Sequence, residues 1–371
     1  MATQTRIPVL DLAPQLETLW EDLNRAMQRV LRSTRYILGP EVRAFEEEAA
    51  SWLGARHAVG CNSGTDALVM SLRALGIGPG DEVITTPFTF FATAEAISQV
   101  GATPVFVDVE EGSMNLDPAL AERAVTPRTR ALLPVHLFGR PCAMDELMDL
   151  AGRRGLKVLE DCAQSFGARA RSRFTGTLGH MGAFSFFPSK NLGTYGDGGL
   201  VVTDDDGLAA AVRALRVHGS LRKYHNETLG YNSRLDELHA AILRVKLPHL
   251  DAWNQGRVRV ARAYGSLLGG KPGIIVPEVV EGHVFHQYTV RLHAGRDRIQ
   301  ARLAEAGVET MVYYPVPCHR LKLYQESHAH VACPNAERLC GEVLSLPIWP
   351  ELEADVQAVV AGVLLDLAAR G

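Results

Sequence analysis

The chain has 371 residues, of which 47% are hydrophobic and 22% are charged, as is typical of a soluble globular protein large enough for two domains. Its net charge of −4, with Lys and Arg residues scattered along the chain, gives no electrostatic reason to expect binding to nucleic acid or to an anionic membrane. The most apolar late stretch, 358–365, is too short to span a bilayer, so no membrane partner is expected either.

The cysteines form no CxxC pair, and the N-terminal residues lack the apolar core of a signal peptide. We therefore expect reduced thiols and a cytoplasmic protein. The six cysteines are Cys61, Cys142, Cys162, Cys318, Cys333 and Cys340.

The first elements in the chain are two predicted helices. Apolar residues recur with a spacing near 3.6 over residues 15–33, which predicts an amphipathic helix. Pro40 can then open a second helix that runs to about Leu53.

From residue 57 onward, short apolar strands alternate with helices. Such alternation predicts an α/β fold with a mostly parallel central sheet flanked by helices, and ligands that bind beyond the carboxyl ends of the strands. The predicted strands are 57–61, 82–85, 104–108, 131–136, 157–161, 183–187 and 199–203, and the predicted helices are 65–75, 89–99, 117–125 and 143–153.

The pattern changes in the last third of the chain. A long helical region is predicted over 234–268, with a kink at Pro248. A strand within VFHQYTVRL, a helix over 297–306, a strand over 308–313 and a terminal helix follow. We therefore expect a large domain of residues 1–248 and a small C-terminal α+β domain of residues 249–371.

Neither a dinucleotide site nor a metal site is predicted. The glycine-rich stretches GTYGDGG and GIGPGD do not match GxGxxG after a first strand, and GxxxxGK[ST] does not occur. His283 and His286 fall in a segment with strand character, where they would face opposite sides, so we interpret both as structural. His328, His330 and Cys333 are interpreted as part of a surface loop.

Two segments at predicted strand ends have two interpretations each. CNSGTDAL (61–68) can bind a phosphate at a helix N-terminus, or Ser63 and Thr65 can simply cap that helix. TPFTFFATAEA (86–96) can place an aromatic ring against a flat ligand, or its phenylalanines can all belong to the core.

A lysine and a strand-end acid make the ligand interpretation more specific. Lys190 lies between an apolar run and a glycine-rich loop in GAFSFFPSKNLGTYGDGG (182–199), and Asp161 ends a predicted strand. A lone lysine is usually a surface residue. Combined with a phosphate site, an aromatic ring and a carboxylate, however, it completes the set of groups that bind pyridoxal phosphate. The lysine would need a lowered pKa, because a Schiff base forms from the neutral amine.

The order of the motifs resembles that of a known enzyme family. SGTDAL, TPFTFFATAEA, GATPVFVDV, PVHLFGRP, EDCAQSFGA, SFFPSKNLGTYGDGG and GYNSRLDELHAAILRVKL together resemble the DegT–StrS group of sugar aminotransferases, over about Pro8 to Pro350. The resemblance implies the fold-type I architecture of pyridoxal-phosphate enzymes.

The resemblance also implies roles for particular residues. Lys190 would be the catalytic Schiff-base lysine, and Asp161 the partner of the cofactor's ring nitrogen. Gly64, Thr65 and Ser185 would bind the phosphate, and Phe90 and Gln164 would contact the ring. Asn232 would reach the cofactor phosphate of a neighbouring subunit, which implies a homodimer with shared active sites, and Tyr314 and His319 would lie near the substrate.

The implied reaction transfers an amino group from L-glutamate to a nucleotide-linked keto sugar. The segments from KYHNETLGYNSRLDE onward and NLGTYGDGG are more similar to enzymes that act on 3-keto sugars, and the same chemistry at C4 is the alternative. Cys318 and Trp349 depart from the residues common in the family, which leaves the sugar open. A catalytically idle, cofactor-binding regulatory protein is the alternative from another class.

Overall fold

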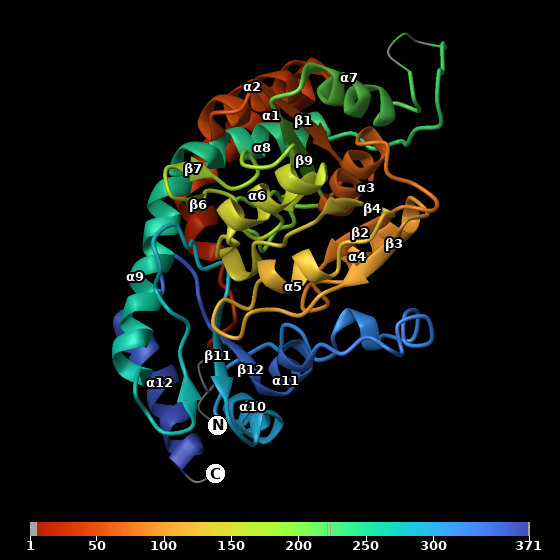
Figure 1. Ribbon diagram of the computed structural model, residues 1–371. Helices are drawn as coiled ribbons and strands as arrows, with labels where there is room; N and C mark the ends of the chain where they lie inside the picture. Colours follow the sequence, from red (N-terminus) through yellow and green to blue (C-terminus); the bar gives the residue numbers. More distant parts are fainter. Residues whose placement is uncertain (1–5, 221, 223, 370–371) are drawn as a thin grey trace.

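The computed structural model describes residues 6–220, 222 and 224–369, and its centre is a seven-stranded sheet with strand order β1-β9-β8-β5-β4-β2-β3 (Figure 1). The strands β8, β5, β4, β2 and β3 run parallel, whereas β9 pairs antiparallel with both β1 and β8. The prediction of a mostly parallel sheet flanked by helices is thus confirmed.

The described strands have these bounds: β1 His57–Cys61, β2 Glu82–Thr85, β3 Thr103–Phe106, β4 Thr129–Leu132, β5 Lys157–Asp161, β6 Arg169–Ala170, β7 Arg173–Phe174, β8 Met181–Ser185, β9 Gly199–Thr203, β10 Ile274–Ile275, β11 Tyr288–Leu292 and β12 Val343–Leu346. The described α-helices are α1 Ala13–Ser33, α2 Pro40–Leu53, α3 Gly64–Ala74, α4 Ala92–Gln99, α5 Pro118–Arg123, α6 Met144–Arg154, α7 Asp206–Leu215, α8 Glu237–Lys246, α9 Leu250–Leu268, α10 Arg296–Glu305, α11 Pro334–Glu342 and α12 Ala354–Ala369.

Both faces of the central sheet are buried. Alternate strand residues point to opposite sides, so that Val83 and Ala131 pack into one core with α3 and α4. Their neighbours Ile84 and Leu132 pack into a second core with α6. Burial on both faces explains why these strands are continuously apolar in the sequence.

The C-terminal part of the chain forms an antiparallel sheet in the order β10-β11-β12, and the long helix α9 runs from the central sheet to this part, beside α12 (Figure 1). Residues from the start of the chain join it: Ile7 bridges to Val308, and Ile348 N–H donates to the carbonyl of Val9. In contrast, Leu339 of α11 packs into the core of the central sheet. The domain division at residue 248 stays a prediction, since the cores cross this boundary in both directions.

Three predicted elements differ from the observed ones. The predicted strand over 308–313 forms only isolated bridges at Val308 and Met311, and β12 pairs with β11 instead. The predicted helix from residue 89 begins at Ala92, after a bend at 87–89 in which Thr86 Oγ1 accepts from the Phe88 N–H. The predicted strand within VFHQYTVRL begins only at Tyr288.

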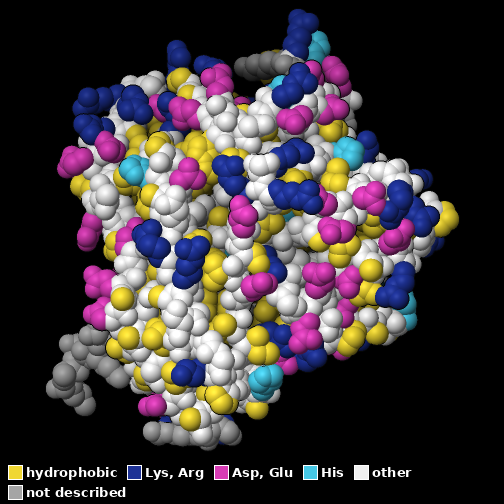
Figure 2. Space-filling view, turned by 60° about the vertical axis from the view of Figure 1, so that its left-hand side comes forward, with side chains coloured by type: hydrophobic (Ala, Val, Ile, Leu, Met, Phe, Trp, Pro, Cys, Tyr) yellow, Lys and Arg dark blue, Asp and Glu magenta, His cyan; other side chains and the backbone are white. Residues whose placement is uncertain are grey.

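Among the described residues, no helix combines the length and the apolar character needed to cross a membrane. All six cysteines are buried and unpaired. Figure 2 shows acidic and basic side chains interspersed on the face that it presents.

The N-terminus of α2 depends on a distant side chain. Gly39 precedes this helix without a side-chain cap, and the buried carboxylate of Glu237, at the start of α8, accepts the N–H groups of Gly39, Glu41 and Val42 at 2.8 to 2.9 Å. One buried carboxylate thus satisfies the donors that a helix leaves open.

We predict that Glu237→Ala lowers the free energy of unfolding by about 2–4 kcal/mol, because it leaves three N–H groups without an acceptor. Chemical denaturation measures the loss. The control is Asp236→Ala, which removes the cap bond to the His239 N–H and the partly exposed contact with His239 Nδ1 at 2.8 Å, and should cost about 1 kcal/mol. Equal losses in the two variants would contradict the role of Glu237.

Candidate active site

A cavity of about 580 Å³ lies beyond the carboxyl ends of β5 and β8. It brings together residues that are far apart in the sequence. Those lining it include Ser63, Gly64, Thr65, Thr89, Phe90, Thr93, Asp161, Gln164, Ser185, Phe187, Lys190, Asp197, His286, Gln287, Tyr313 and Tyr314.

One end of the cavity is suited to an anion. Ser63 caps α3 by accepting from the Asp66 N–H at 3.1 Å, so the first backbone N–H groups, those of Gly64 and Thr65, have no acceptor within the helix. The hydroxyl of Ser185 lies beside them, and a Cβ added at Gly64 would come within 2.7 Å of the Ser185 Cβ. The two sequence interpretations of this segment are therefore compatible, because the cap and the anion site use different groups.

Asp161 provides a carboxylate at a defined position in the cavity wall. Its Oδ2 accepts from the Thr93 hydroxyl at 2.8 Å and its Oδ1 from the Ala163 N–H at 3.1 Å. Burial raises the pKa of this carboxyl, whereas the two hydrogen bonds and the charge of Lys190 act in the opposite direction. Such an acid suits a partner that carries a proton on nitrogen.

Lys190 lies in the same cavity, on the loop that follows β8. Burial lowers the pKa of its amine to about 8, against the opposing effect of the Asp161 charge. The neutral fraction near physiological pH is therefore far larger than that of an ordinary lysine, and a lysine that attacks a carbonyl reacts in the neutral form.

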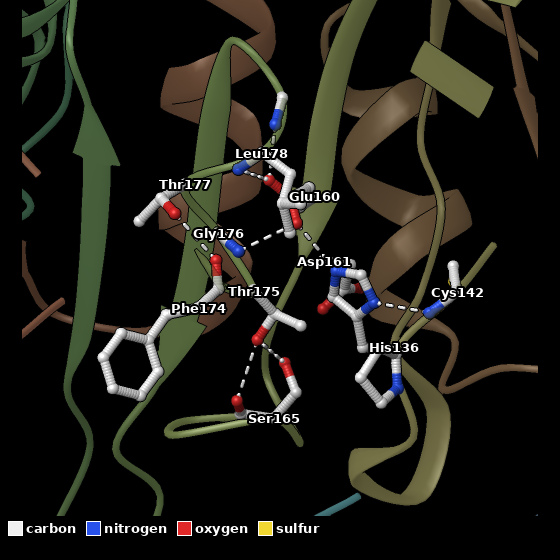
Figure 3. A network of polar contacts seen from close by, with 12 residues as sticks. His136, Cys142, Glu160, Asp161, Ser165, Phe174, Thr175, Gly176, Thr177 and Leu178 are labelled. Atoms are coloured by element: carbon white, nitrogen blue, oxygen red, sulfur yellow. Dashed lines mark hydrogen bonds and ion pairs between the residues drawn. The ribbon is translucent and has the colours of Figure 1, made fainter. Parts of the chain in front are cut away.

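The second acid at the end of β5, Glu160, points to the opposite face of the sheet and takes no part in the cavity. Its carboxylate accepts the backbone N–H groups of Gly176, Leu178 and Gly179 at 2.7 to 2.8 Å, and contacts His136 Nε2 at 2.9 Å (Figure 3). The Cys142 N–H donates to His136 Nδ1, which places the ring proton on Nε2.

Glu160, His136 and Cys162 are close enough to suggest a metal site. However, both ring nitrogens of His136 and both carboxylate oxygens of Glu160 already have partners in the described structure. The arrangement is a buried structural network.

The aromatic residues of the segment 86–96 have separate roles. Phe90 lines the cavity with 60% of its surface exposed, whereas Phe88 is completely buried and Phe91 packs against Tyr324. Phe90 is thus the one of the three that is available to a flat ligand.

Gln164 and Tyr314 form a hydrogen-bonded pair at the cavity. Gln164 Oε1 accepts from the Phe138 N–H at 2.6 Å, which fixes its amide, and its Nε2 donates to the Tyr314 hydroxyl at 3.0 Å. Both residues therefore have defined positions before any ligand binds.

Two predicted site residues lie elsewhere. His319 is fully buried and is not among the residues that line the cavity; its Nε2 contacts Glu337 at 2.9 Å and its ring packs near Phe106. This placement differs from the predicted substrate contact, because α11 supplies a carboxylate that binds the imidazole. Asn232 is exposed and bridges to Val217 at the base of the segment between α7 and α8, which projects from the body (Figure 1).

Sequence reasoning missed His286, Gln287 and Tyr313, which also line the cavity. His286 was predicted to be a structural strand residue that faces the opposite side from His283. Because β11 begins only at Tyr288, alternation does not apply to this segment. No motif singled out His286 or Gln287, whereas Tyr313 directly precedes Tyr314 in the segment YYPVPCHRLKLY (313–324).

The fold and the site together define a class. A neutralisable lysine and a buried strand-end carboxylate face an anion site at a helix N-terminus, in an α/β fold with a mostly parallel sheet, and this is the arrangement of a pyridoxal-phosphate enzyme of the aminotransferase type. The residues present therefore fit this cofactor.

The chain belongs to the DegT/DnrJ/EryC1/StrS aminotransferase family, whose model matches residues 17–364. The predicted family is thereby confirmed, and with it the cofactor, since this family depends on pyridoxal phosphate.

Individual relatives are similar over nearly their whole length. The chain is 49% identical to the UDP-N-acetyl-3-dehydro-alpha-D-glucosamine 3-aminotransferase of Acidithiobacillus ferrooxidans, covering 98% of each chain. It is 48% identical to a "pleiotropic regulatory protein" of Geobacillus stearothermophilus, covering 95% of this chain and 96% of that one. The structure of S. venezuelae DesV in complex with a ketimine intermediate matches with a TM-score of 0.96 and 48% identity, over 99% of this chain and 100% of that chain.

We predict that Gly64→Ala weakens pyridoxal phosphate binding about 10-fold or more, because the added methyl group collides with Ser185 beside the anion site. Absorbance titration of the protein with the cofactor measures the change. The control is Gly362→Ala on the exposed face of α12, where an added Cβ has nothing within 4 Å. Unchanged affinity in Gly64→Ala would rule out this end of the cavity as the phosphate site.

Proposed function

We propose that this enzyme transfers an amino group from L-glutamate to the keto group at C3 of a nucleotide-linked sugar. The observation that carries the proposal is the cavity in which Lys190, with its lowered pKa, faces Asp161. The position on the sugar rests on the similarity to the Acidithiobacillus enzyme, whose name specifies a 3-aminotransferase.

Different residues of the chain would perform different parts of the reaction. When bound, pyridoxal phosphate supplies a carbonyl that captures an amine and a ring that withdraws electrons. Lys190 acts as general base and then as general acid, and carries the proton between the donor's α-carbon and the cofactor's C4′ atom. Asp161 keeps the ring nitrogen protonated. Its fixed hydrogen bonds from Thr93 and Ala163 prevent it from turning away.

The remaining predicted residues would bind and orient the cofactor and the substrate. Gly64, Thr65 and Ser185 would hold the phosphate through N–H and O–H donors, as expected at a helix N-terminus. Phe90 would cover one face of the ring. Gln164 would contact the ring or its oxygen and also hold Tyr314 toward the substrate, since the two side chains are bonded to each other.

We also propose that the enzyme is a cytoplasmic homodimer with shared active sites. Asn232 lies outside the cavity of its own subunit, on a segment whose described residues Tyr224 and Leu229 are 85% and 84% exposed. Apolar side chains so exposed on a projecting segment favour burial against a second copy. The six buried, unpaired cysteines fit a reducing compartment.

Product analysis tests the proposed reaction. With L-glutamate and a 3-keto nucleotide sugar, NMR should detect a sugar with an amino group at C3, whereas the 4-keto isomer should remain unreacted. Lys190→Ala should reduce turnover by at least about 10³-fold, because it removes the group that moves the proton. An amino group at C4, or full turnover by Lys190→Ala, would contradict the proposal.

The similarity to a protein named as a regulatory protein favours a second candidate, a cofactor-binding regulator without catalysis. The colour of the purified protein separates the two functions. The absorbance of the bound cofactor should change on addition of L-glutamate if the protein is an aminotransferase, and should persist if it is an idle regulator.

We predict that mixing two impaired variants restores activity if the sites are shared. Lys190→Ala lacks the lysine and Asn232→Ala lacks the residue proposed to reach across. A mixed dimer therefore contains one site with both residues intact and one site with neither. Since half of the dimers in an equimolar mixture are mixed, the mixture should recover up to about a quarter of the wild-type rate per subunit. No recovery after exchange of subunits, verified by size and tag analysis, would show that each cavity is complete within one chain.

A further inference from the structure

His286 lines the active-site cavity, and none of the roles proposed above belongs to it. Its side chain is only 5% exposed, and its backbone N–H donates to the carbonyl of Phe138 at 2.9 Å. Its Nδ1 lies 3.1 Å from the Oδ1 atom of Asn191, the residue next to Lys190.

A chain of hydrogen bonds determines which nitrogen of His286 carries the proton. Asn254 Nδ2 donates to the carbonyl of Phe166 at 3.1 Å, so its Oδ1 accepts from Asn191 Nδ2 at 2.7 Å. Asn191 Nδ2 also donates to the carbonyl of Val284 at 3.2 Å. Backbone carbonyls only accept, which sets the orientation of both amides. Asn191 Oδ1 must therefore accept, and His286 Nδ1 must donate.

This assignment leaves Nε2 of His286 as a bare acceptor. Among the described residues it has no hydrogen-bond partner, and it is not one of the fully buried atoms without one. The side chain is accessible from the cavity that it lines. Burial, followed by the positive charges of Lys190 and Arg257, holds the pKa of His286 well below its usual range, so the ring stays neutral at physiological pH.

Lys190 is a cation that lines the same cavity as this acceptor. Its Nζ has no hydrogen-bond partner within the described part of the chain, and its charge acts on His286. In the proposed reaction, Lys190 becomes an ammonium group each time it takes a proton from carbon. An ammonium group in a partly dry cavity requires acceptors.

We propose that His286 is a positioning residue for Lys190: its Nε2 accepts a hydrogen bond from the protonated amine and holds it between the two carbon atoms that exchange the proton. The inference rests on the proposed function and deepens it. Asn191 holds the imidazole in the required tautomer, and Asn254 in turn orients Asn191. The loop that carries Lys190 and the histidine that accepts the hydrogen bond from its amine are thus linked through one network.

Two substitutions of His286 distinguish the role of Nε2 as an acceptor from the role of Nδ1 as a donor to Asn191. In His286→Asn, the amide N–H takes the place of Nδ1 and can still donate to Asn191, but no acceptor reaches the cavity. In His286→Gln, the longer amide can place its oxygen near the position of Nε2. His283→Asn is the matched control, because His283 is buried three residues earlier, contacts the Phe138 carbonyl and does not line the cavity.

The test follows the reaction of the holoenzyme with L-glutamate by stopped-flow absorbance, with and without deuterium at the α-carbon. His286→Asn should slow this half-reaction about 10- to 100-fold and increase the primary isotope effect, while His286→Gln recovers part of the rate. The apparent affinity for glutamate should change less than about 2-fold, since the binding groups remain. His283→Asn should keep the wild-type rate and isotope effect, and melting temperatures verify that all variants are folded.

Other outcomes would overturn the proposal. A wild-type rate and isotope effect in His286→Asn would show that Lys190 does not use this acceptor. A defect confined to the keto-sugar half-reaction would assign His286 to the sugar instead. As a readout without turnover, ¹⁵N-histidine NMR should show one ring, absent in His286→Asn, with Nδ1 protonated and Nε2 bare at neutral pH, and a protonated Nε2 would contradict the inference. A wild-type enzyme that does not react with glutamate would refute the proposed function, and the NMR result would still decide the tautomer.

Discussion

The buried carboxylate of Glu160 is the interaction on which the geometry of the active site depends. An isolated charge in the core of an α/β sheet would be strongly destabilising, and here three backbone N–H groups and the His136 ring compensate for the lost solvation. These donors come from the loop 176–179 and from the segment after β4. One side chain therefore ties two loops to the end of β5, as Figure 3 shows.

The next residue along β5, Asp161, is held in position by the same part of the structure. The Asp161 N–H donates to the carbonyl of Pro134 at 2.9 Å, and the His136 N–H donates back to the Asp161 carbonyl at 3.1 Å. The backbone of Asp161 is thus held to the segment 134–136 through both its N–H and its carbonyl, and its carboxylate is held by Thr93 and Ala163. Strand alternation directs Glu160 to the structural face and Asp161 to the cavity. Two adjacent acids thereby acquire different functions.

Lys190 is held by a different mechanism, because its loop has no regular secondary structure to position it. Side chains from later elements anchor this loop: the buried Lys246 of α8 donates to the Gly193 carbonyl at 2.6 Å, and Asn191 is bonded to Asn254 of α9. The cavity is therefore assembled from the ends of strands, one helix N-terminus and a loop fixed from outside. Such an arrangement keeps the reactive amine in place while leaving its Nζ free to react.

Local patterns in the sequence determined much of this protein. Hydrophobic periodicity predicted the parallel sheet and its helices, because burial on both faces leaves a direct record in the residue types. The order of short motifs predicted the family and the cofactor, and it identified residues such as Gly64, Asp161 and Lys190 that the fold brings to one cavity. Only the tertiary structure decided which side chains meet. His319 turns to Glu337 of α11 instead of the cavity, and His286 enters the cavity wall because its segment lies outside β11. These pairings join residues through packing between distant elements, and neither local spacing nor residue type records such contacts.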